Sequence, residues 1–286
     1  MSVDAGGRIR SALFTPGTDA ERMRKALASG ADICIFDLED SVAPERLNAA
    51  RDTIARTLAD VAHRGRIWVR VHPASTPEMR DDLASLPLAR LGGIVLPKVA
   101  HEDEIDNCQD AIAATGGSRP LPVMAIVESA RGVLNCQTIA LARDLAVLAL
   151  GRFDLAADLG VDPDDGTPAL AAARAMIVLA SGAAGLFQPL DSPWLKIADL
   201  DGLREAAEAG RREGFGGMLL IHPSHVEAVN QAFSPSADQV TWAHNIVTSA
   251  RDAAAAGRGA YAQNGQMVDE AIVRRARAIL RDAEAG

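Results

Sequence analysis

The amino-acid sequence predicts a (β/α)8 barrel, the TIM-barrel fold, followed by a helical extension. Three observations lead to this prediction. The chain has 286 residues, a length that suits one barrel with an addition. Short apolar runs alternate with longer helical segments along most of it. Hydrophobic residues make up 48% of the chain but aromatic residues only 3%, so the core must consist mainly of Ala, Val, Leu and Ile, as in barrel strands and their covering helices.

The predicted strands are short runs of aliphatic and β-branched residues. They cover residues 11–16, 33–36, 67–71, 93–96, 121–127, 145–150, 187–190 and 217–221. The predicted helices cover about 19–29, 44–63, 132–143, 168–184 and 199–213, and most begin at a Thr, Asp or Pro, as helices commonly do. We assign residues 1–233 to the barrel and residues 234–286 to a helical lid.

An open, doubly wound sheet would also alternate strands and helices. Such a sheet usually carries a Gly-rich phosphate-binding turn after its first strand. Here the first strand ends in Pro16, followed by Gly17 and Thr18, and these residues do not form such a turn. The barrel is therefore favoured.

One strand-helix-strand unit in the middle of the chain carries two candidate metal ligands. Glu128 directly follows the strand at 121–127, and Asp154 comes shortly after the strand at 145–150. Strands joined by a crossover helix are parallel, so both acids lie on the same rim. Two converging carboxylates are what Mg²⁺ needs, and the ion would keep its other positions for water and substrate. The alternative is that both acids cap the helices that follow them.

The other strand ends form an acidic rim with few cations, and a divalent metal would relieve the repulsion among its acids. Arg70 is a candidate for binding an anionic substrate because its planar fork pairs with a carboxylate. Its alternative role is a structural ion pair with the rim acids. Lys98 could form a Schiff base, although the acid pair argues against this. The remaining rim residues are Asp37, Glu39, Asp40, His72, Asp191 and His222.

Composition and charge argue against several classes of partner. The net charge of -9, without a basic cluster, argues against nucleic acid or an acidic membrane surface. Cys34, Cys108 and Cys136 show no metal-ligand spacing and indicate thiols in a reducing compartment. The first ten residues contain no apolar signal region, and no stretch is long enough to span a bilayer. We therefore expect a soluble, cytoplasmic protein that acts on a small molecule.

Motifs occur in order along nearly the whole chain. They are Arg10 with Ser11, LFTPG at 13–17, FDLEDSV at 36–42, VRV at 69–71, LPK at 96–98, IVESARG at 126–132, DLAADLG at 154–160, GFGG at 214–217, IHPS at 221–224 and GQMVD at 265–269. Together they closely resemble the citrate lyase β-subunit-like group of the HpcH/HpaI aldolase family, the relatives of malyl-CoA and citramalyl-CoA lyases.

The resemblance implies a metal and substrate site. Glu128 of the IVESARG motif and Asp154 of the DLAADLG motif would be the two Mg²⁺ ligands, and Glu128 would also contact the substrate. Arg70 would hold the carboxylate end of the substrate, and Arg10 of the first motif would contribute to substrate binding.

The resemblance also implies catalytic acids and an assembly. Glu39 and Asp40 would lie around the water shell of the metal. Asp269 would be carried by the carboxyl-terminal lid over the active site of a neighbouring subunit, where it would transfer protons. The family is typically trimeric, so we expect a homo-oligomer with shared sites.

The expected function is that of a magnesium-dependent lyase. It would cleave a carbon-carbon bond in a β-hydroxyacyl-CoA thioester of malyl-CoA, citramalyl-CoA or citryl type, giving an acyl-CoA and a 2-oxo acid. Two alternatives stay open. The chain could be a thioesterase acting on the same substrates, or a non-catalytic citrate-lyase-like subunit.

Overall fold

The computed structural model describes residues 8–284, apart from 61–63, 117–119, 165, 256, 258 and 264. The chain divides into two compact units. Ile9–Phe233 belong to the first unit, whereas Arg8 and the residues from Ser234 onward belong to the second.

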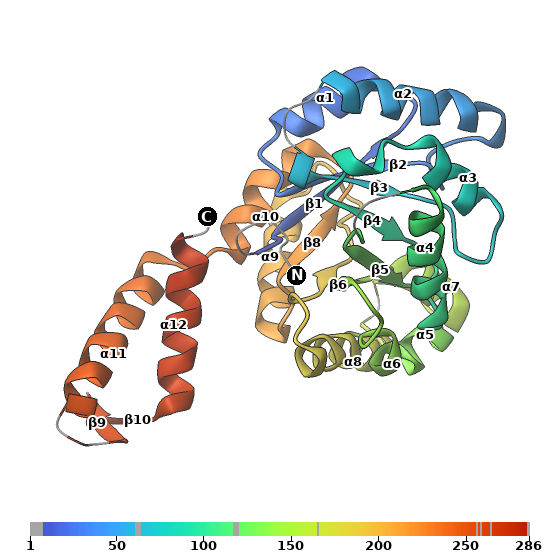
Figure 1. Cartoon of the computed structure of the whole chain (residues 1–286). Helices are drawn as coiled ribbons and strands as arrows, with labels where there is room; N and C mark the ends of the chain where they lie inside the picture. Colours follow the sequence, from blue (N-terminus) through green and yellow to red (C-terminus); the bar gives the residue numbers. More distant parts are fainter. Residues whose placement is uncertain are drawn as a thin grey trace. The chain divides into compact units, whose positions relative to one another are not determined.

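The first unit is a closed barrel in which parallel strands follow one another in chain order and the last strand pairs with the first (Figure 1). This confirms the predicted (β/α)8 fold. The strands are β1 (Ser11–Pro16), β2 (Ile33–Asp37), β3 (Ile67–Arg70), β4 (Gly93–Leu96), β5 (Val123–Val127), β6 (Leu145–Leu150), β7 (Leu190–Asp191) and β8 (Gly217–Leu220). The predicted seventh strand at 187–190 is shorter and later than expected, since Pro189 has no N–H group to give to a strand ladder.

Side chains on the strands alternate between the inside of the barrel and the layer under the helices. In β2, Ile33 and Ile35 join the inner cluster with Trp68 and Met124. Phe36, one residue further on, belongs to the outer cluster that packs against the helices. Both faces of the strands are therefore buried, as a parallel barrel requires. The inside of the barrel is filled with side chains, so a ligand site must lie at one of its ends.

Helices cover the outside of the barrel (Figure 1). Asp19 and Asp199 accept backbone N–H groups at the starts of two of them, as the sequence predicts. The helices are α1 (Ala20–Ala28), α2 (Leu47–Asp60), α3 (Glu78–Ser85), α4 (Asp103–Ala114), α5 (Ala130–Leu134), α6 (Cys136–Ile139), α7 (Arg152–Leu159), α8 (Pro168–Ala184), α9 (Leu200–Glu213) and α10 (Val226–Phe233). Short 3₁₀ turns lie at Pro44–Arg46, Arg64–Arg66, Leu88–Arg90 and Pro223–His225.

The predicted crossover helix at 132–143 is wrong in its details. The chain instead forms the two short helices α5 and α6, which meet at Asn135. The side-chain amide of Asn135 donates to the carbonyl oxygen of Ala100 at 2.8 Å, so it ties this break to the loop after β4. Leu134 and Leu141, two apolar residues of this segment, are each 72% exposed.

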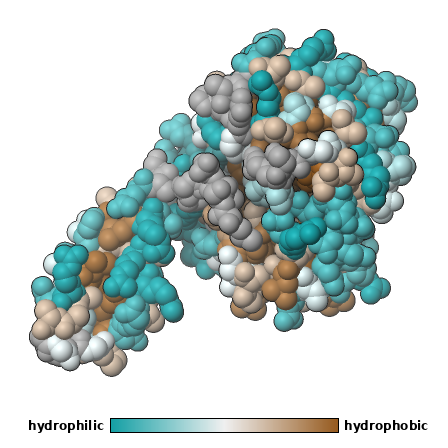
Figure 2. Space-filling view, in the orientation of Figure 1, coloured by the Kyte–Doolittle hydropathy of each residue, from teal (hydrophilic) through white to brown (hydrophobic). Residues whose placement is uncertain are grey.

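The second unit is a helical hairpin. Helices α11 (Ala237–Ala255) and α12 (Glu270–Glu284) pack against each other, and the antiparallel strands β9 (Tyr261–Gln263) and β10 (Gln266–Val268) lie between them in the chain. Its own small core is formed by Ala243, Ile246, Val268, Val273 and Ala276. Figure 2 shows hydrophobic surface along this unit, flanked by hydrophilic surface. Among all the described helices, none combines the length and apolar character needed to cross a membrane.

Candidate active site

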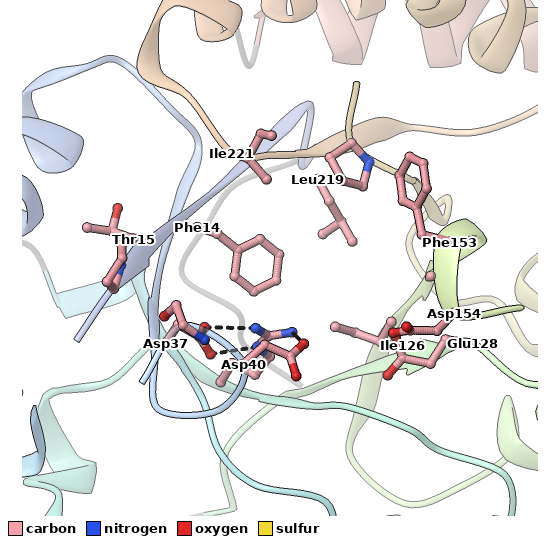
Figure 3. Close-up of a pocket in the computed structure, with 15 residues that line it drawn as sticks. Phe14, Thr15, Asp37, Asp40, Ile126, Glu128, Phe153, Asp154, Leu219 and Ile221 are labelled. Atoms are coloured by element: carbon pink, nitrogen blue, oxygen red, sulfur yellow. Dashed lines mark hydrogen bonds and ion pairs between the residues drawn. The ribbon is translucent and has the colours of Figure 1, made fainter. Parts of the chain in front are cut away.

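A pocket of about 380 Å³ opens at the carboxyl ends of the barrel strands, where the sequence predicted the site (Figure 3). Its lining includes Ile126 and Leu219, which lie on strands β5 and β8 and belong to the inner cluster, and Phe14 of β1, which packs against that cluster. The other lining residues are Thr15, Pro16, Asp37, Asp40, Ser41, Arg70, Glu128, Gly151, Phe153, Asp154, Pro193 and Ile221.

Glu128 and Asp154 lie side by side in this pocket (Figure 3). Glu128 directly follows the buried strand β5 and is only 8% exposed, while Asp154 lies in the first turn of α7. The pKa of Glu128 is raised to about 8, first by burial and then by the hydrogen bond and charge of Asp154, against the opposing effect of the Lys98 N–H group. Gly151 leaves room for Glu128, because a Cβ at position 151 would lie 2.5 Å from its Oε2. The two carboxylates predicted from the strand ends are therefore brought together.

Lys98 links two groups of acids at the rim. Its backbone N–H donates to Glu128 Oε1 at 2.7 Å, and its Nζ donates to Glu39 Oε1 at 2.5 Å. The backbone of Lys98 lies in the left-handed region, with φ of 56°, which residues with a side chain rarely adopt. The hydrogen bond that Lys98 donates to Glu39 raises the pKa of Lys98 and outweighs desolvation. A Schiff-base lysine must be neutral to attack a carbonyl, so the paired ammonium argues against that role.

Arg70 lies at the centre of an acidic cluster. Its Nε and Nη2 donate to the two oxygens of Asp37 at 2.6 and 2.8 Å. Its Nη1 lies 3.0 Å from Glu39 Oε2 and 3.2 Å from Asp40 Oδ2. The guanidinium also lies over the ring of Phe14, 4.8 Å from the centroid. The two roles expected for Arg70 are thus both compatible with its position, since it is held by an ion pair and still lines the pocket.

Asp37 was one of the rim acids but was not singled out as a functional residue. It is 2% exposed and also accepts the backbone N–H groups of Glu39 and Ser41 at 3.0 and 3.1 Å. Burial alone would raise the pKa of Asp37, but the hydrogen bonds and charge of Arg70 outweigh it, so the pKa lies below its ordinary value. Its position at the carboxyl end of β2 was the feature that could have identified Asp37 as a site residue.

The remaining predicted site residues lie in different places. Asp40 lines the pocket, while Glu39 is buried behind it against Lys98. Arg10 is not in the pocket lining. It precedes β1 at the amino end of the barrel, where it is held by Asp32 through Nε and Nη2 at 3.0 and 2.9 Å. Asp269 belongs to the second unit, where its carboxylate accepts the N–H of Ile272 at the start of α12.

The pocket suits a magnesium ion. Within the described parts of the chain no group of three or more His, Cys, Asp or Glu side chains is arranged to enclose a metal. Mg²⁺ does not need such a cage, because it is usually held by one or two carboxylates and keeps several waters. A close pair of acids, in which the pKa of Glu128 is raised, is the arrangement that a divalent cation would relieve. The donor set of Glu128 and Asp154 therefore fits this ion.

Fold and site together define a barrel protein with an acidic cation pocket at the carboxyl ends of its strands. Residues 10–223 match the HpcH/HpaI aldolase/citrate lyase family. The chain is 36% identical over 279 residues to a (3S)-malyl-CoA thioesterase of Cereibacter sphaeroides, covering 97% of this chain and 95% of the relative. The chain belongs to the HpcH/HpaI aldolase/citrate lyase family, which confirms the resemblance seen in the sequence.

Solved structures show the same fold. The protein CitE of Mycobacterium tuberculosis, crystallised with magnesium, acetoacetate and coenzyme A, is 32% identical and matches with a TM-score of 0.80 over 97% of this chain and 99% of that chain. A citrate lyase β subunit of the same organism, in complex with oxaloacetate and magnesium, is 32% identical and matches with a TM-score of 0.70 over 82% of this chain and 100% of that chain.

Proposed function

We propose that this chain is a magnesium-dependent lyase that cleaves a β-hydroxyacyl-CoA thioester to an acyl-CoA and a 2-oxo acid. The observation that carries the proposal is the carboxylate pair of Glu128 and Asp154 in one pocket with Arg70, at the active end of a barrel. The structures of related proteins with magnesium, a small oxo acid and coenzyme A support the cofactor and the substrate class.

The residues of the pocket have complementary roles in this proposal. Glu128 and Asp154 would hold Mg²⁺, which when bound polarises the oxygen that becomes the carbonyl of the 2-oxo acid. Arg70, which lines the pocket while Asp37 accepts from its Nε and Nη2, would orient the substrate carboxylate through its positive charge. Asp40, exposed at the pocket edge, and Glu39, buried behind it, would order the water around the site.

Bond cleavage needs a proton to be taken and another to be given. The β-hydroxyl group would pass its proton to the water ordered by Asp40 and become the carbonyl of the 2-oxo acid, while the electron pair of the broken carbon-carbon bond moves to the α-carbon of the acyl-CoA. That carbon must then be protonated. We propose that Asp269 of a neighbouring subunit serves in this transfer, which requires a homo-oligomer, and we retain a trimer as the expected state. The hydrophobic surface of the helical hairpin supports a role in docking (Figure 2).

A second activity is favoured by one comparison. The relative from Cereibacter sphaeroides is named a (3S)-malyl-CoA thioesterase, so hydrolysis of the same thioester is the alternative function. A non-catalytic subunit is less well supported, because the acid pair and Arg70 are all present in the pocket. We also propose a cytoplasmic location, in line with the buried free thiols of Cys34, Cys108 and Cys136.

Mass spectrometry of the products tests the proposal. The protein is incubated with Mg²⁺ and malyl-CoA or citramalyl-CoA, with EDTA, Glu128→Ala and the exposed Glu102→Gln as controls. Acetyl-CoA and a 2-oxo acid, lost with EDTA and with Glu128→Ala but kept with Glu102→Gln, would establish the lyase. Free CoA with the hydroxy acid would show a thioesterase instead, and turnover that survives in Glu128→Ala would contradict the assigned site.

A further inference from the structure

The pocket carries an excess of negative charge on its described lining. Four carboxylates line it, those of Asp37, Asp40, Glu128 and Asp154, and the cation among the lining residues is Arg70. A bound divalent ion would balance two more of these charges. The lining would then still carry about one net negative charge before any substrate enters. A singly charged anion held directly by the metal and Arg70 is accommodated more easily than a doubly charged one.

The cations near the pocket are already engaged by acids. Asp37 occupies the Nε and Nη2 donors of Arg70, while Nη1 contacts Glu39 and Asp40. The ammonium of Lys98 lies 2.5 Å from Glu39 and 3.8 Å from Asp40. Among the described residues that line the pocket, a second guanidinium or ammonium for another carboxylate is lacking.

The side of the pocket facing the acids is apolar. Figure 3 shows Phe153, Leu219 and Ile221 across the pocket from Asp37, Asp40 and Glu128. A carboxylate pressed against such a wall would lose hydration without gaining a hydrogen bond, whereas a hydrogen or methyl group would not. The polar side can hold the oxo and carboxylate oxygens of a substrate, so the substituent beyond them meets the apolar wall.

We infer that the site selects a monocarboxylic 2-oxo acid with hydrogen or a small alkyl group on the carbonyl carbon, such as glyoxylate or pyruvate, over a dicarboxylic one such as oxaloacetate. This inference rests on the proposed function. It makes malyl-CoA or citramalyl-CoA the substrate class of this chain and disfavours a citryl thioester, whose cleavage would release oxaloacetate. Ile221 is the specificity residue most open to change, because its side chain lines the pocket and the residue is 38% exposed.

Calorimetric titration of the full chain in saturating Mg²⁺ tests the inference without requiring turnover. The probes are pyruvate, 2-oxobutyrate and oxaloacetate. The last two differ only in a methyl group against a carboxylate at the far end, so they separate charge from length. Pyruvate formed from oxaloacetate is measured at the end of each titration, because oxaloacetate loses CO₂ in the presence of Mg²⁺. We expect 2-oxobutyrate and pyruvate to bind at least about tenfold more tightly than oxaloacetate. This is the ratio expected when the second carboxylate of oxaloacetate is repelled by one negative charge of a partly desolvated site.

Two variants of Ile221 provide the matched comparison. Ile221→Arg places a cation on the apolar wall, and it should reduce the preference for 2-oxobutyrate over oxaloacetate at least about tenfold. Ile221→Gln adds polarity without charge and should leave the preference nearly unchanged. Equal or tighter binding of oxaloacetate by the unmodified protein would overturn the inference while leaving the proposed function standing. Absence of magnesium-dependent binding by all three oxo acids would overturn both.

Discussion

The ion pair between Asp37 and Arg70 gives a direct test of how the pocket is held together. Asp37 is 2% exposed and binds the guanidinium at 2.6 and 2.8 Å. Asp37→Asn keeps the size of the side chain and removes its charge. Breaking a buried pair costs about 3–5 kcal/mol. Glu39 and Asp40 still compensate part of the charge of Arg70, so we expect a loss near the lower end, about 3 kcal/mol, in the free energy of unfolding.

A neighbouring acid in the same loop supplies the control. Asp40 also contacts Arg70, at 3.2 Å, but its side chain is 59% exposed. Asp40→Asn should therefore cost less than about 1 kcal/mol, as exposed ion pairs do. Urea unfolding followed by circular dichroism, at one protein concentration, measures both variants. Equal losses of stability in the two variants would refute the reasoning, because burial is what distinguishes the two acids.

The pH dependence of the same pair has a definite sign. The pKa of Asp37 lies below its ordinary value in the folded protein. Its contribution to stability is therefore fully present above the unfolded value of about 3.9 and is lost as the pH falls through the folded pKa. The stability difference between the unmodified protein and Asp37→Asn should shrink in that acid range, and a difference that stays constant there would contradict the assignment.

Three further predictions concern other parts of the rim. Protons compete with Mg²⁺ for Glu128, whose pKa is about 8. Calorimetry should therefore show the magnesium affinity rising about tenfold per pH unit below about pH 8 and levelling above it. A magnesium affinity that does not change with pH would contradict this prediction. In urea unfolding, Lys98→Gly should be more stable than Lys98→Ala by about 1 kcal/mol. Both variants lose the contact with Glu39, but only glycine adopts a φ of 56° freely. A higher stability of Lys98→Ala would contradict this prediction. The hydrogen bond that the His72 ring donates to Asp82 raises the pKa of His72, so the stabilisation by His72 is complete below about pH 6.5 and is lost as the pH rises through the folded pKa. The melting temperature of His72→Gln should therefore fall further below that of the unmodified protein at about pH 5.5 than at about pH 8.5. Equal differences at the two pH values would argue against the pair.

The barrel and the central acid pair could be predicted because both follow from local rules. Alternating apolar runs fix the strands, and parallel strands bring Glu128 and Asp154 to one rim whatever the details of packing. The break at Asn135 could not be predicted in this way, because it depends on a hydrogen bond to the carbonyl of Ala100, which is distant in the sequence.

The roles of single charged residues were harder to predict. Sequence alone left Arg70 between a substrate contact and an ion pair, and only the positions of Asp37, Glu39 and Asp40 show how its donors are shared. Arg10 lies close in the chain to the pocket residue Phe14, but it precedes β1 at the amino end of the barrel. Which end of a strand a residue occupies decides whether it can reach the site.

Calorimetric titration of Mg²⁺ into the unmodified protein, Glu128→Gln and Glu102→Gln tests the central claim most directly. The account predicts one magnesium ion per chain in the unmodified protein and in Glu102→Gln, whose altered residue is exposed outside the pocket lining. It predicts affinity weaker by about 100-fold or more in Glu128→Gln, because one of two charged ligands is lost. Unchanged magnesium affinity in Glu128→Gln would contradict the account.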